Sequence, residues 1–382
     1  MRTPGVLARV AELLTDAWGG PVRARDADLL KSWSRTDVLR LRLDAPAGRP
    51  PTVIVKRSKH AERGADEHAA LTLVSEAGRA AGTVPRVLAA DPALRLLVLE
   101  DLGAGPTVEQ LLRGHDGEEA ADAVIGTARA VGRLHAATAD LGAEYDRRRD
   151  RLGPRTPPLV QAVRDLHDDR AALAAWLGAL DVHEPAHVER TLTEMGARLA
   201  APAAFGVLTH GDVAPANAVR GSAGVLLVDF EYAGVRHALT DTLCWTLACP
   251  FPLELAMRAD AAYRAEARAA LPMLDDDAAA GAARILVVGA RVLDLLRWLP
   301  PALLLRDRGW APGMSGRQAV LWHLERALAI AERDGAGGLE PLVPTLRLLS
   351  VRLSARWTAE RDTLFTWPAL RAGTAARRRA VP

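Results

Sequence analysis

Strand-like segments gather near the start of this sequence, and that placement limits the folds the chain can adopt. Residues 38–43 largely alternate apolar and basic side chains, and the β-branched run 52–56 follows a proline-rich turn, so the two segments predict a β-hairpin. Two more short strands are expected at 84–90 and 94–99, with a helix over 62–80 before them. We therefore expect a β-rich unit that opens the chain.

The segment Gly103-Ala104-Gly105-Pro106 breaks the chain after that unit, and we place a lobe boundary there. Beyond it, residues 118–137 have the spacing of an amphipathic helix, and prolines interrupt the charged helices expected over 139–205. An island of strands over 207–228 precedes a succession of helices to about residue 370. The sequence thus predicts an α+β chain with a small β-rich part and a large, mainly helical part.

Charge and hydropathy exclude several classes of partner. Lysine and arginine total 49 against 47 acidic residues, a balance that predicts no nucleic-acid partner and no membrane partner. The most apolar long stretch, 285–305, carries Arg291, Asp294 and Arg297 on one stripe, which predicts an amphipathic core helix and not a membrane span. The first residues lack the features of a signal peptide, and we expect a cytoplasmic protein.

The two cysteines, Cys244 and Cys249, lie five residues apart in and just after a helix predicted over 240–248. At that spacing on an α-helix the two side chains diverge, so we expect no disulfide and interpret both as core residues. This use of cysteine is typical of a reducing compartment.

The residues that indicate chemistry follow a short predicted strand, Val207-Leu208-Thr209. Asp212 and Asn217 stand five positions apart in the next loop, and Asp229 follows the apolar strand 225–228. One carboxylate and one amide oxygen suit Mg²⁺, which takes few protein oxygens and completes its shell with water and phosphate. Asp212 is then left to face a nucleophilic hydroxyl, as phosphoryl transfer requires.

The motif His210-Gly211-Asp212, the later Asn217 and the motif Asp229-Phe230-Glu231 resemble the aminoglycoside phosphotransferase and choline kinase-like family, which shares the protein-kinase fold. The resemblance implies a bilobal α+β fold with a small β-rich N-lobe and a large, mainly helical C-lobe. The expected parts are a nucleotide-binding lobe, a hinge, and a helical lobe with the catalytic loop and acceptor site, at 1–100, 101–105 and 106–382.

Upstream residues extend the resemblance to an ATP site. Lys56 resembles the strand lysine that meets the nucleotide phosphates, and Glu67 resembles the helix glutamate that pairs with it. Glu62 and Glu76 are rivals for the second role. The segment 97–103 resembles the hinge of the family, where the backbone would hold adenine at Glu100, Asp101 and Leu102.

One segment departs from the kinase pattern. The turn that covers the phosphates is usually rich in glycine, because glycine lets backbone N–H groups approach phosphate. The matching segment here is Ser32-Trp33-Ser34-Arg35-Thr36, without glycine. Ser34, Arg35 and Thr36 offer hydroxyl or guanidinium donors instead, and the sequence leaves open how the phosphates are covered and whether ATP or GTP is preferred.

Two absences from the sequence narrow the kinase type. Gly211 stands where protein kinases place the arginine that responds to activation-loop phosphorylation, and only twelve residues separate Asp229 from Asp241. Both features favour a small-molecule kinase without that control. The resemblance implies that Asp241 and His210 brace the catalytic loop and that His135 is structural.

Two further observations on the sequence argue against competing functions. His183-Glu184-Pro185-Ala186-His187 has the letters of a zinc-protease motif, but that motif needs an unbroken helix and Pro185 opposes one. The sequence contains no Gly-x4-Gly-Lys-Ser/Thr motif, which excludes a P-loop kinase.

The resemblance places the acceptor among the helices of 139–205 and 246–370. Tryptophans in this region are expected mainly in the core: Trp245, Trp298, Trp310 and Trp322. The acidic residues that a cationic acceptor would meet are Glu231, Asp260 and Asp294, although Asp294 shares its helix with two arginines.

The sequence thus predicts an ATP-dependent phosphotransferase that moves the γ-phosphate to a hydroxyl of a small molecule: an antibiotic, a sugar, an amino alcohol or a biosynthetic intermediate. The expected cofactors are ATP and Mg²⁺, with Asp212 catalytic and Asn217 and Asp229 as metal ligands. Two alternatives stay open: an enzyme that acts on a peptide in natural-product biosynthesis or transfers a nucleotidyl group, and a nucleotide-binding pseudokinase. The sequence does not indicate the oligomeric state.

Overall fold

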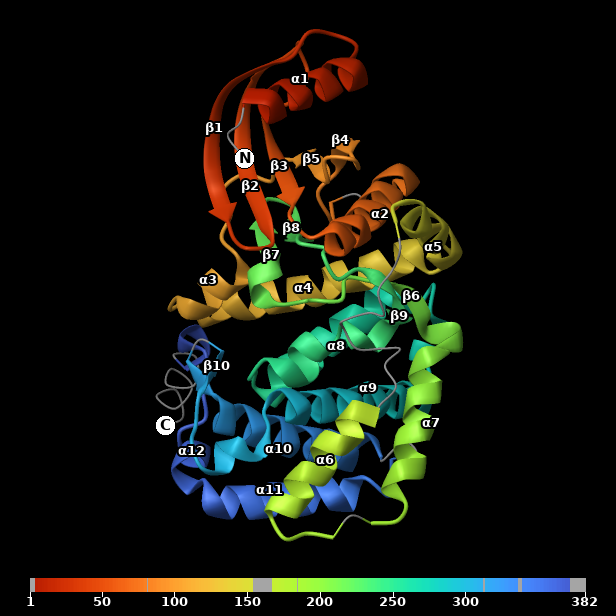
Figure 1. The fold of residues 1–382 in the computed structure, drawn as a ribbon, viewed down its shortest axis with the longest axis vertical. Coiled ribbons are helices and arrows are strands. Elements are labelled where there is room, and N and C mark those ends of the chain that lie inside the picture. The colour runs from red at the N-terminus through yellow and green to blue at the C-terminus, as the bar shows by residue number, and fades with distance from the viewer. Residues whose placement is uncertain are drawn as a thin grey trace, which may run out of the picture.

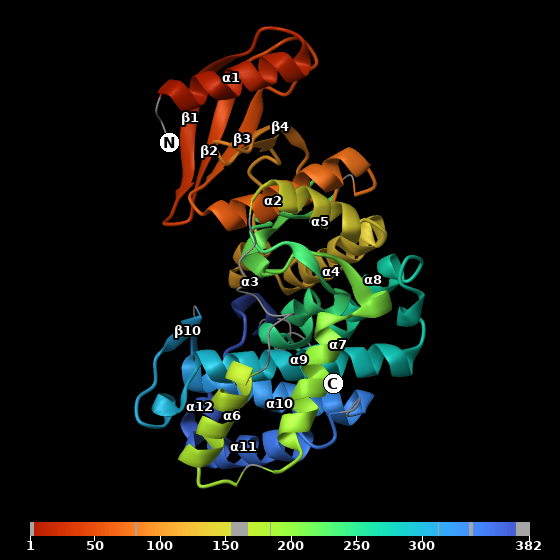
Figure 2. The same ribbon diagram turned by 45° about the vertical axis from the view of Figure 1, so that its right-hand side comes forward.

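The computed structural model describes residues 4–80, 82–153, 167–183, 185–311, 313–335 and 339–371. Figure 1 shows a β-rich part at the top and a larger helical part below it, and Figure 2 shows the same division after a turn about the vertical axis. The predicted α+β class, with a β-rich N-lobe and a helical C-lobe, is confirmed. The residue limits of the two lobes and the hinge stay predictions.

The N-lobe is a five-stranded antiparallel sheet with the order β1-β2-β3-β5-β4. Its strands are β1 (Arg23–Ser32), β2 (Thr36–Asp44), β3 (Thr52–Ser58), β4 (Val87–Asp91) and β5 (Leu96–Glu100). The predicted hairpin is the pair β2–β3, in which Val38 lies opposite Lys56. Two helices belong to this lobe, α1 (Pro4–Trp18) and α2 (Ala61–Ala77).

The sheet separates two hydrophobic cores because side chains alternate across a strand. On β5, Leu96 and Val98 pack with Val10 and Leu14 of α1, whereas Leu97 and Leu99 join the core that continues into the C-lobe. The central strands β3 and β5 therefore have fixed faces, and this register directs Lys56 at the end of β3 toward α2 and the C-lobe.

The C-lobe consists mainly of helices. They are α3 (Val108–Arg113), α4 (Gly117–Thr138), α5 (Gly142–Arg151), α6 (His167–Ala179), α7 (Val188–Ala200), α8 (Leu253–Ala267), α9 (Asp277–Trp298), α10 (Gly316–Asp334), α11 (Val343–Arg356) and α12 (Thr358–Asp362). Helix α4 packs along α8, and α9 packs between α6 and α10 (Figure 1). The expected amphipathic helix is α9, where Asp294 accepts hydrogen bonds from Arg291 and Arg297.

Short strand pairs form the upper edge of the C-lobe. Strand β6 (Gly206–Thr209) pairs with β9 (Gly234–His237), and β7 (Ala218–Gly221) pairs with β8 (Gly224–Leu227). A further pair, β10 (Gly309–Ala311) and β11 (Met314–Ser315), lies far from them. The predicted island of strands is therefore confirmed, and the loops after β6 and β8 face the N-lobe.

The sequence did not predict strand β1. Its side chains are mostly exposed or half-buried along the whole strand, so the apolar alternation of a half-buried strand is missing. It is instead an edge strand that carries charged side chains, as edge strands commonly do.

The expectation that Cys244 and Cys249 diverge is wrong. Residues Cys244–Ala248 form a π-helical turn, in which the N–H of Cys249 donates to the carbonyl of Cys244 over 3.0 Å. A π turn brings residues five apart onto one side, and the two free thiols lie 3.9 Å apart between their Sγ atoms. The hydrogen bond with Cys249 and burial raise the pKa of Cys244, in keeping with a core residue.

Two further expectations concern helices. None of the described helices is both long and apolar enough to cross a membrane. The zinc-protease letters do not lie on a helix, because α7 begins only at Val188, after His187; Glu184 lies outside the described residues.

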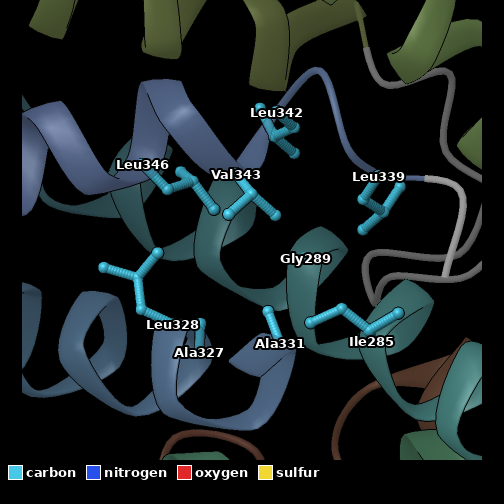
Figure 3. Close-up of a pocket in the computed structure, with 9 residues that line it drawn as sticks. All are labelled: Ile285, Gly289, Ala327, Leu328, Ala331, Leu339, Leu342, Val343 and Leu346. Atoms are coloured by element: carbon cyan, nitrogen blue, oxygen red, sulfur yellow. The ribbon is translucent and has the colours of Figure 1, made fainter. Parts of the chain in front are cut away.

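A small cavity lies among α9, α10 and α11 (Figure 3). Its lining is apolar: Ile285, Gly289, Ala327, Leu328, Ala331, Leu339, Leu342, Val343 and Leu346. The cavity measures about 10 Å³, which is the volume of roughly one water-sized sphere. We interpret it as a packing defect of the helical core.

Two buried histidines make the stability of the fold depend on pH. Burial, helped by nearby cationic side chains, lowers the pKa of His237 to about 4 and that of His323 to about 3. In an unfolded chain both would titrate near 6.5. The unfolded state therefore takes up protons first as the pH falls, and stability is lost from about pH 6.5 downward.

We predict that the free energy of unfolding falls below about pH 6.5 by about 1.4 kcal/mol per pH unit for each of these histidines. His323→Gln keeps a donor for the carbonyl of Ala319, which His323 now contacts over 2.8 Å, but does not titrate. Its stability should fall less steeply with acid in urea unfolding at about pH 7 and about pH 5. The exposed His115 provides the matched control, His115→Gln, and equal slopes for both variants would contradict the prediction.

Candidate active site

A buried ammonium group joins the two lobes. Lys56 Nζ lies 2.7 Å from Glu67 Oε1 of α2 and 2.6 Å from Asp229 Oδ1 of the loop after β8. The same Glu67 oxygen accepts the N–H of Phe230 over 3.2 Å. The structure thus pairs Lys56 with Glu67 and not with its rivals Glu62 or Glu76; Glu76 instead pairs with Arg148.

The charged groups in this cluster shift the pKa values of one another. Burial and the neighbouring Asp229 raise the pKa of Glu67 despite the Lys56 ammonium. Burial opposes the charge of Lys56, but the two carboxylates outweigh it and raise the pKa of Lys56. Burial also opposes the charge of Asp229, and Lys56 and Lys31 outweigh it and lower the pKa of that carboxyl. Lys56 and Asp229 are therefore charged at neutral pH.

The loop after β6 is held by a buried carboxylate. Asp241 accepts the N–H of His210 over 2.7 Å and the N–H of Gly211 over 2.9 Å, and His135 Nε2 lies 3.0 Å from the same carboxylate. Burial opposes the charge of Asp241, and the hydrogen bond from His135 counters it and lowers the pKa. The expected bracing role of Asp241 and the structural role of His135 are confirmed.

His210 also braces the loop, as expected. Its Nε2 lies 3.0 Å from the carbonyl of Val228, and its Nδ1 accepts the N–H of Asp212 over 3.2 Å. One imidazole therefore links the loop after β6 to the end of β8. This link brings the segment with Asp212 alongside the segment with Asp229.

Asp212 and Asn217 contact each other at the surface of this loop. The amide Nδ2 of Asn217 donates to the Asp212 carbonyl over 3.0 Å and to Asp212 Oδ2 over 3.1 Å, so the amide Oδ1 is the atom left for a cation. The Asp212 side chain is solvent-accessible but lies among many protein atoms, and this partial desolvation, with the charge of Asp229, raises its pKa. Among the predicted residues, Asp212, Asn217 and Asp229 are thus brought to one place.

The backbone of Asp229 has a φ of 70°, in the left-handed region. This conformation is uncommon outside glycine, although aspartate tolerates it better than most residues, and such strain clusters at functional sites. The turn aims the carboxylate at Lys56, which lies on a strand of the other lobe.

The predicted hinge is braced by a side chain that the sequence did not indicate. Arg40 of β2 pairs with Asp101 at 2.8 Å and also donates to the carbonyl of Gly103 over 2.8 Å. Burial opposes ionisation, but Arg40 and the N–H of Gly103 lower the pKa of Asp101. No local sequence signal reveals Arg40, because its partner lies 61 residues away.

The hinge residues offer unequal backbone groups. The N–H of Glu100 already donates to the carbonyl of Arg86 over 2.9 Å. In the described part of the chain, neither backbone polar group of Leu102 bonds to another protein group. The N–H of Glu100 is therefore already used, whereas the backbone groups of Leu102 are available to a nucleobase, and the role of all three hinge residues stays a prediction.

The turn between β1 and β2 is anchored to the C-lobe. Arg35 lies 3.2 Å from Glu231 Oε1 and donates to the hydroxyl of Tyr232 over 2.9 Å. Arg63 stacks on the Tyr232 ring at 4.5 Å. Ser34, by contrast, is exposed at the tip. The predicted donors of this turn therefore differ: Ser34 faces solvent, whereas Arg35 is engaged by the motif that carries Asp229.

The acidic residues considered for a cationic acceptor are all paired. Glu231 contacts Arg35, Asp260 lies 2.8 Å from Arg284, and Asp294 accepts from two arginines of its own helix. Of the four tryptophans, Trp245 is fully buried, as expected for most of them, whereas Trp298 is 52% exposed.

An N-lobe lysine is paired with a helix glutamate and a C-lobe carboxylate, and a second carboxylate and an amide lie on a neighbouring C-lobe loop. This is the arrangement of a kinase-type phosphotransferase. A family model described as the phosphotransferase enzyme family matches residues 26–276. Because this match spans more than half of the chain, the chain belongs to that family, and it is an enzyme of the kinase type.

Solved structures with a similar fold include kinases from several bacteria. A choline/ethanolamine kinase family protein from Mesorhizobium loti is 18% identical with a TM-score of 0.44, over 85% of this chain and 93% of its own. A macrolide 2′-phosphotransferase from Brachybacterium faecium is 16% identical with a TM-score of 0.44, over 80% and 99%. A choline kinase from Streptococcus pneumoniae is 12% identical with a TM-score of 0.42, over 86% and 99%. These overlaps are partial, so the assignment rests on the family match.

A search of curated protein sequences gave no match.

Gly211 occupies a position that no other residue fits. Its φ is +83°, and a β-carbon added there would lie 2.0 Å from the carbonyl oxygen of Tyr232 and 2.9 Å from Arg236 Nη1. We predict that Gly211→Ala lowers stability by at least about 1 kcal/mol. It should also lower activity on the order of 100-fold, because the displaced loop misaligns Asp212.

The matched control is Gly178→Ala on α6, where an added β-carbon meets no atom within 4 Å. This variant should be as stable as the wild type or slightly more stable, since alanine favours helix. Urea unfolding measures both variants. Equal stabilities for Gly211→Ala and the wild type would show that the loop is not packed as the structure describes.

Proposed function

We propose that this phosphotransferase moves the γ-phosphate of ATP to a hydroxyl group of a small molecule. One observation carries the proposal: Lys56 with Glu67 from the N-lobe meets Asp229, with Asp212 and Asn217 nearby, from two separate loops of the C-lobe. Phosphoryl transfer needs this combination of a phosphate cation, metal-holding oxygens and a carboxylate for the acceptor.

The residues at the lobe junction fit a magnesium ion. Asp229 supplies carboxylate oxygens and Asn217 supplies Oδ1, since its Nδ2 is already bonded to Asp212. Such a set suits Mg²⁺, which is commonly held by one or two protein oxygens together with nucleotide phosphates. When bound, Mg²⁺ would neutralise charge on the β- and γ-phosphates.

The protein residues then have distinct tasks. Lys56, fixed by Glu67, holds the phosphates of the nucleotide, and the backbone near Leu102 holds the base. Asp212 orients the acceptor hydroxyl and takes its proton as the acceptor oxygen bonds to phosphorus and the bond to the leaving ADP oxygen breaks. Asn217 keeps the Asp212 carboxylate in place through its amide.

The pairing of the acidic residues considered above favours an acceptor that is recognised without a strong positive charge. Glu231, Asp260 and Asp294 are each neutralised by arginine, so none offers an uncompensated carboxylate to an ammonium group. Uncharged hydroxyl compounds such as sugars fit this better than polycationic ones. We propose that helices from 139–205 and 246–370 line this acceptor side.

We predict that Asp212→Asn lowers turnover by about 10²- to 10⁴-fold, because it removes the base while keeping the shape of the side chain. The affinity for Mg²⁺ and ATP should stay nearly unchanged. An acceptor screen with γ-labelled ATP, followed by mass analysis of the product, measures transfer and separates a phosphate from a nucleotide adduct. Nucleotide binding is measured by calorimetry.

The exposed Asp16 on α1 supplies a charge-matched control, Asp16→Asn, which should behave as the wild type. Undiminished turnover in Asp212→Asn would refute the role of this carboxylate. A wild-type chain without any Mg²⁺-dependent response to ATP would refute the proposed function and favour the pseudokinase alternative.

A further inference from the structure

Lysine is rare in this chain, and its positions are not scattered. Lysine and arginine total 49 residues, but only three are lysines, Lys31, Lys56 and Lys59. All three lie around the turn between β1 and β2 and around Asp229. An ammonium is a compact point charge with rotatable donors, whereas arginine presents a planar fork of donors, so the two cations are not interchangeable. The placement points to three separate tasks at one site.

Lys59 positions the covering turn. Its Nζ donates to the carbonyl of Trp33 over 2.7 Å and lies 2.7 Å from Asp37 Oδ1, while its N–H donates to the carbonyl of Arg35 over 2.7 Å. Ser32 donates to the same Asp37 oxygen over 2.6 Å. With Arg35 held by Glu231 on the other side, the turn is fixed without any glycine.

Lys31 has a different environment. It lies next to the end of β1, its Nζ is 3.7 Å from Asp229 Oδ2, and it sits 4.4 Å from the centre of the Trp33 ring. Its side chain is 36% exposed, whereas that of Lys56 is 9% exposed. In the described part of the chain, Asp229 is the only carboxylate within 4 Å of Lys31 Nζ. Lys31 is therefore the more exposed and more loosely held partner of Asp229, and Lys56 is the buried one with a second carboxylate.

A metal ion on Asp229 would change this balance. Each carboxylate oxygen of Asp229 now faces an ammonium group, Oδ1 toward Lys56 and Oδ2 toward Lys31. A divalent cation on the carboxylate repels both, but Glu67 retains Lys56. Lys31 keeps no protein carboxylate, and the nearest negative charge is then the polyphosphate that accompanies the metal.

On this basis, and resting on the proposed function, we propose that Lys31 is a nucleotide-binding residue that exchanges partners. Without nucleotide its ammonium neutralises Asp229. With the metal–nucleotide complex bound, it leaves Asp229 and binds the outer phosphates. It thereby stabilises the phosphates with an ammonium where a glycine-rich turn would use the hydrogen bonds of its backbone N–H groups.

The test uses the full chain with Lys31→Gln, and Arg42→Gln as the matched control. Arg42 is a cation on the same sheet whose ion pairs, with Asp26 and Asp28, are exposed. Calorimetry measures the affinity for ATP with Mg²⁺, for AMP, and for Mg²⁺ alone. Thermal unfolding checks that both variants fold.

We predict that Lys31→Gln weakens binding of ATP with Mg²⁺ on the order of tenfold, the size of a lost charge-assisted contact, and changes AMP binding less than about twofold. It should strengthen binding of Mg²⁺ alone, because the competing ammonium is gone. Lys31→Arg should recover part of the ATP affinity, and Arg42→Gln should match the wild type.

The proposal is overturned by two results: ATP affinity in Lys31→Gln equal to that in Arg42→Gln, or an equal loss for ATP and AMP. Weaker binding of Mg²⁺ alone also contradicts the exchange and indicates a merely structural lysine. If the wild type binds ATP and transfers phosphate, any of these results counts against Lys31 alone. A wild type that binds no nucleotide overturns both proposals.

Discussion

The Lys56 ammonium, shared between Glu67 and Asp229, is the contact on which the arrangement of the two lobes depends. It joins a central strand, the helix beside it and a C-lobe loop within hydrogen-bonding distance. Burying these charges is costly unless each is paired, and loss of one partner would leave an uncompensated buried charge worth about 3–5 kcal/mol. The residues to which the proposed chemistry assigns tasks therefore also help to align the lobes, so the proposal ties folding and function to one set of contacts.

A second, independent support fixes the catalytic loop. Asp241 accepts two successive backbone N–H groups and contacts His135, whose other ring nitrogen lies 3.0 Å from the hydroxyl of Tyr263. All of these contacts lie within the C-lobe and involve buried groups. The loop is thus preorganised by the protein alone, and no nucleotide contact is needed to shape it.

The fold was largely predictable where side-chain periodicity reflects burial. The hairpin, helix α4 and the strand island follow such patterns, whereas β1 does not, because its side chains are exposed along its length. The prediction for the cysteines near the Cys244–Ala248 turn was also wrong. It assumed the periodicity of an α-helix, and a π turn places residues five apart on one side.

The candidate site was predictable where its residues share a loop or a motif. Asp212, Asn217 and Asp229 lie close together in sequence, and their grouping followed from the spacing. The pairs Arg35–Glu231 and Arg40–Asp101 join distant segments and leave no local pattern. Lys31 did leave a signal, the scarcity of lysine, but its contact with Asp229 depends on the path of β1.

Gly211 also limits the evolutionary paths open to this enzyme. A side chain at this position would run into the carbonyl of Tyr232 and the guanidinium of Arg236, so the arginine of phosphorylation-gated kinases is not one substitution away. Gaining it would require rebuilding the strand β9 and the Asp229 motif together. Lineages that keep this packing therefore cannot acquire that arginine by a single change at this position.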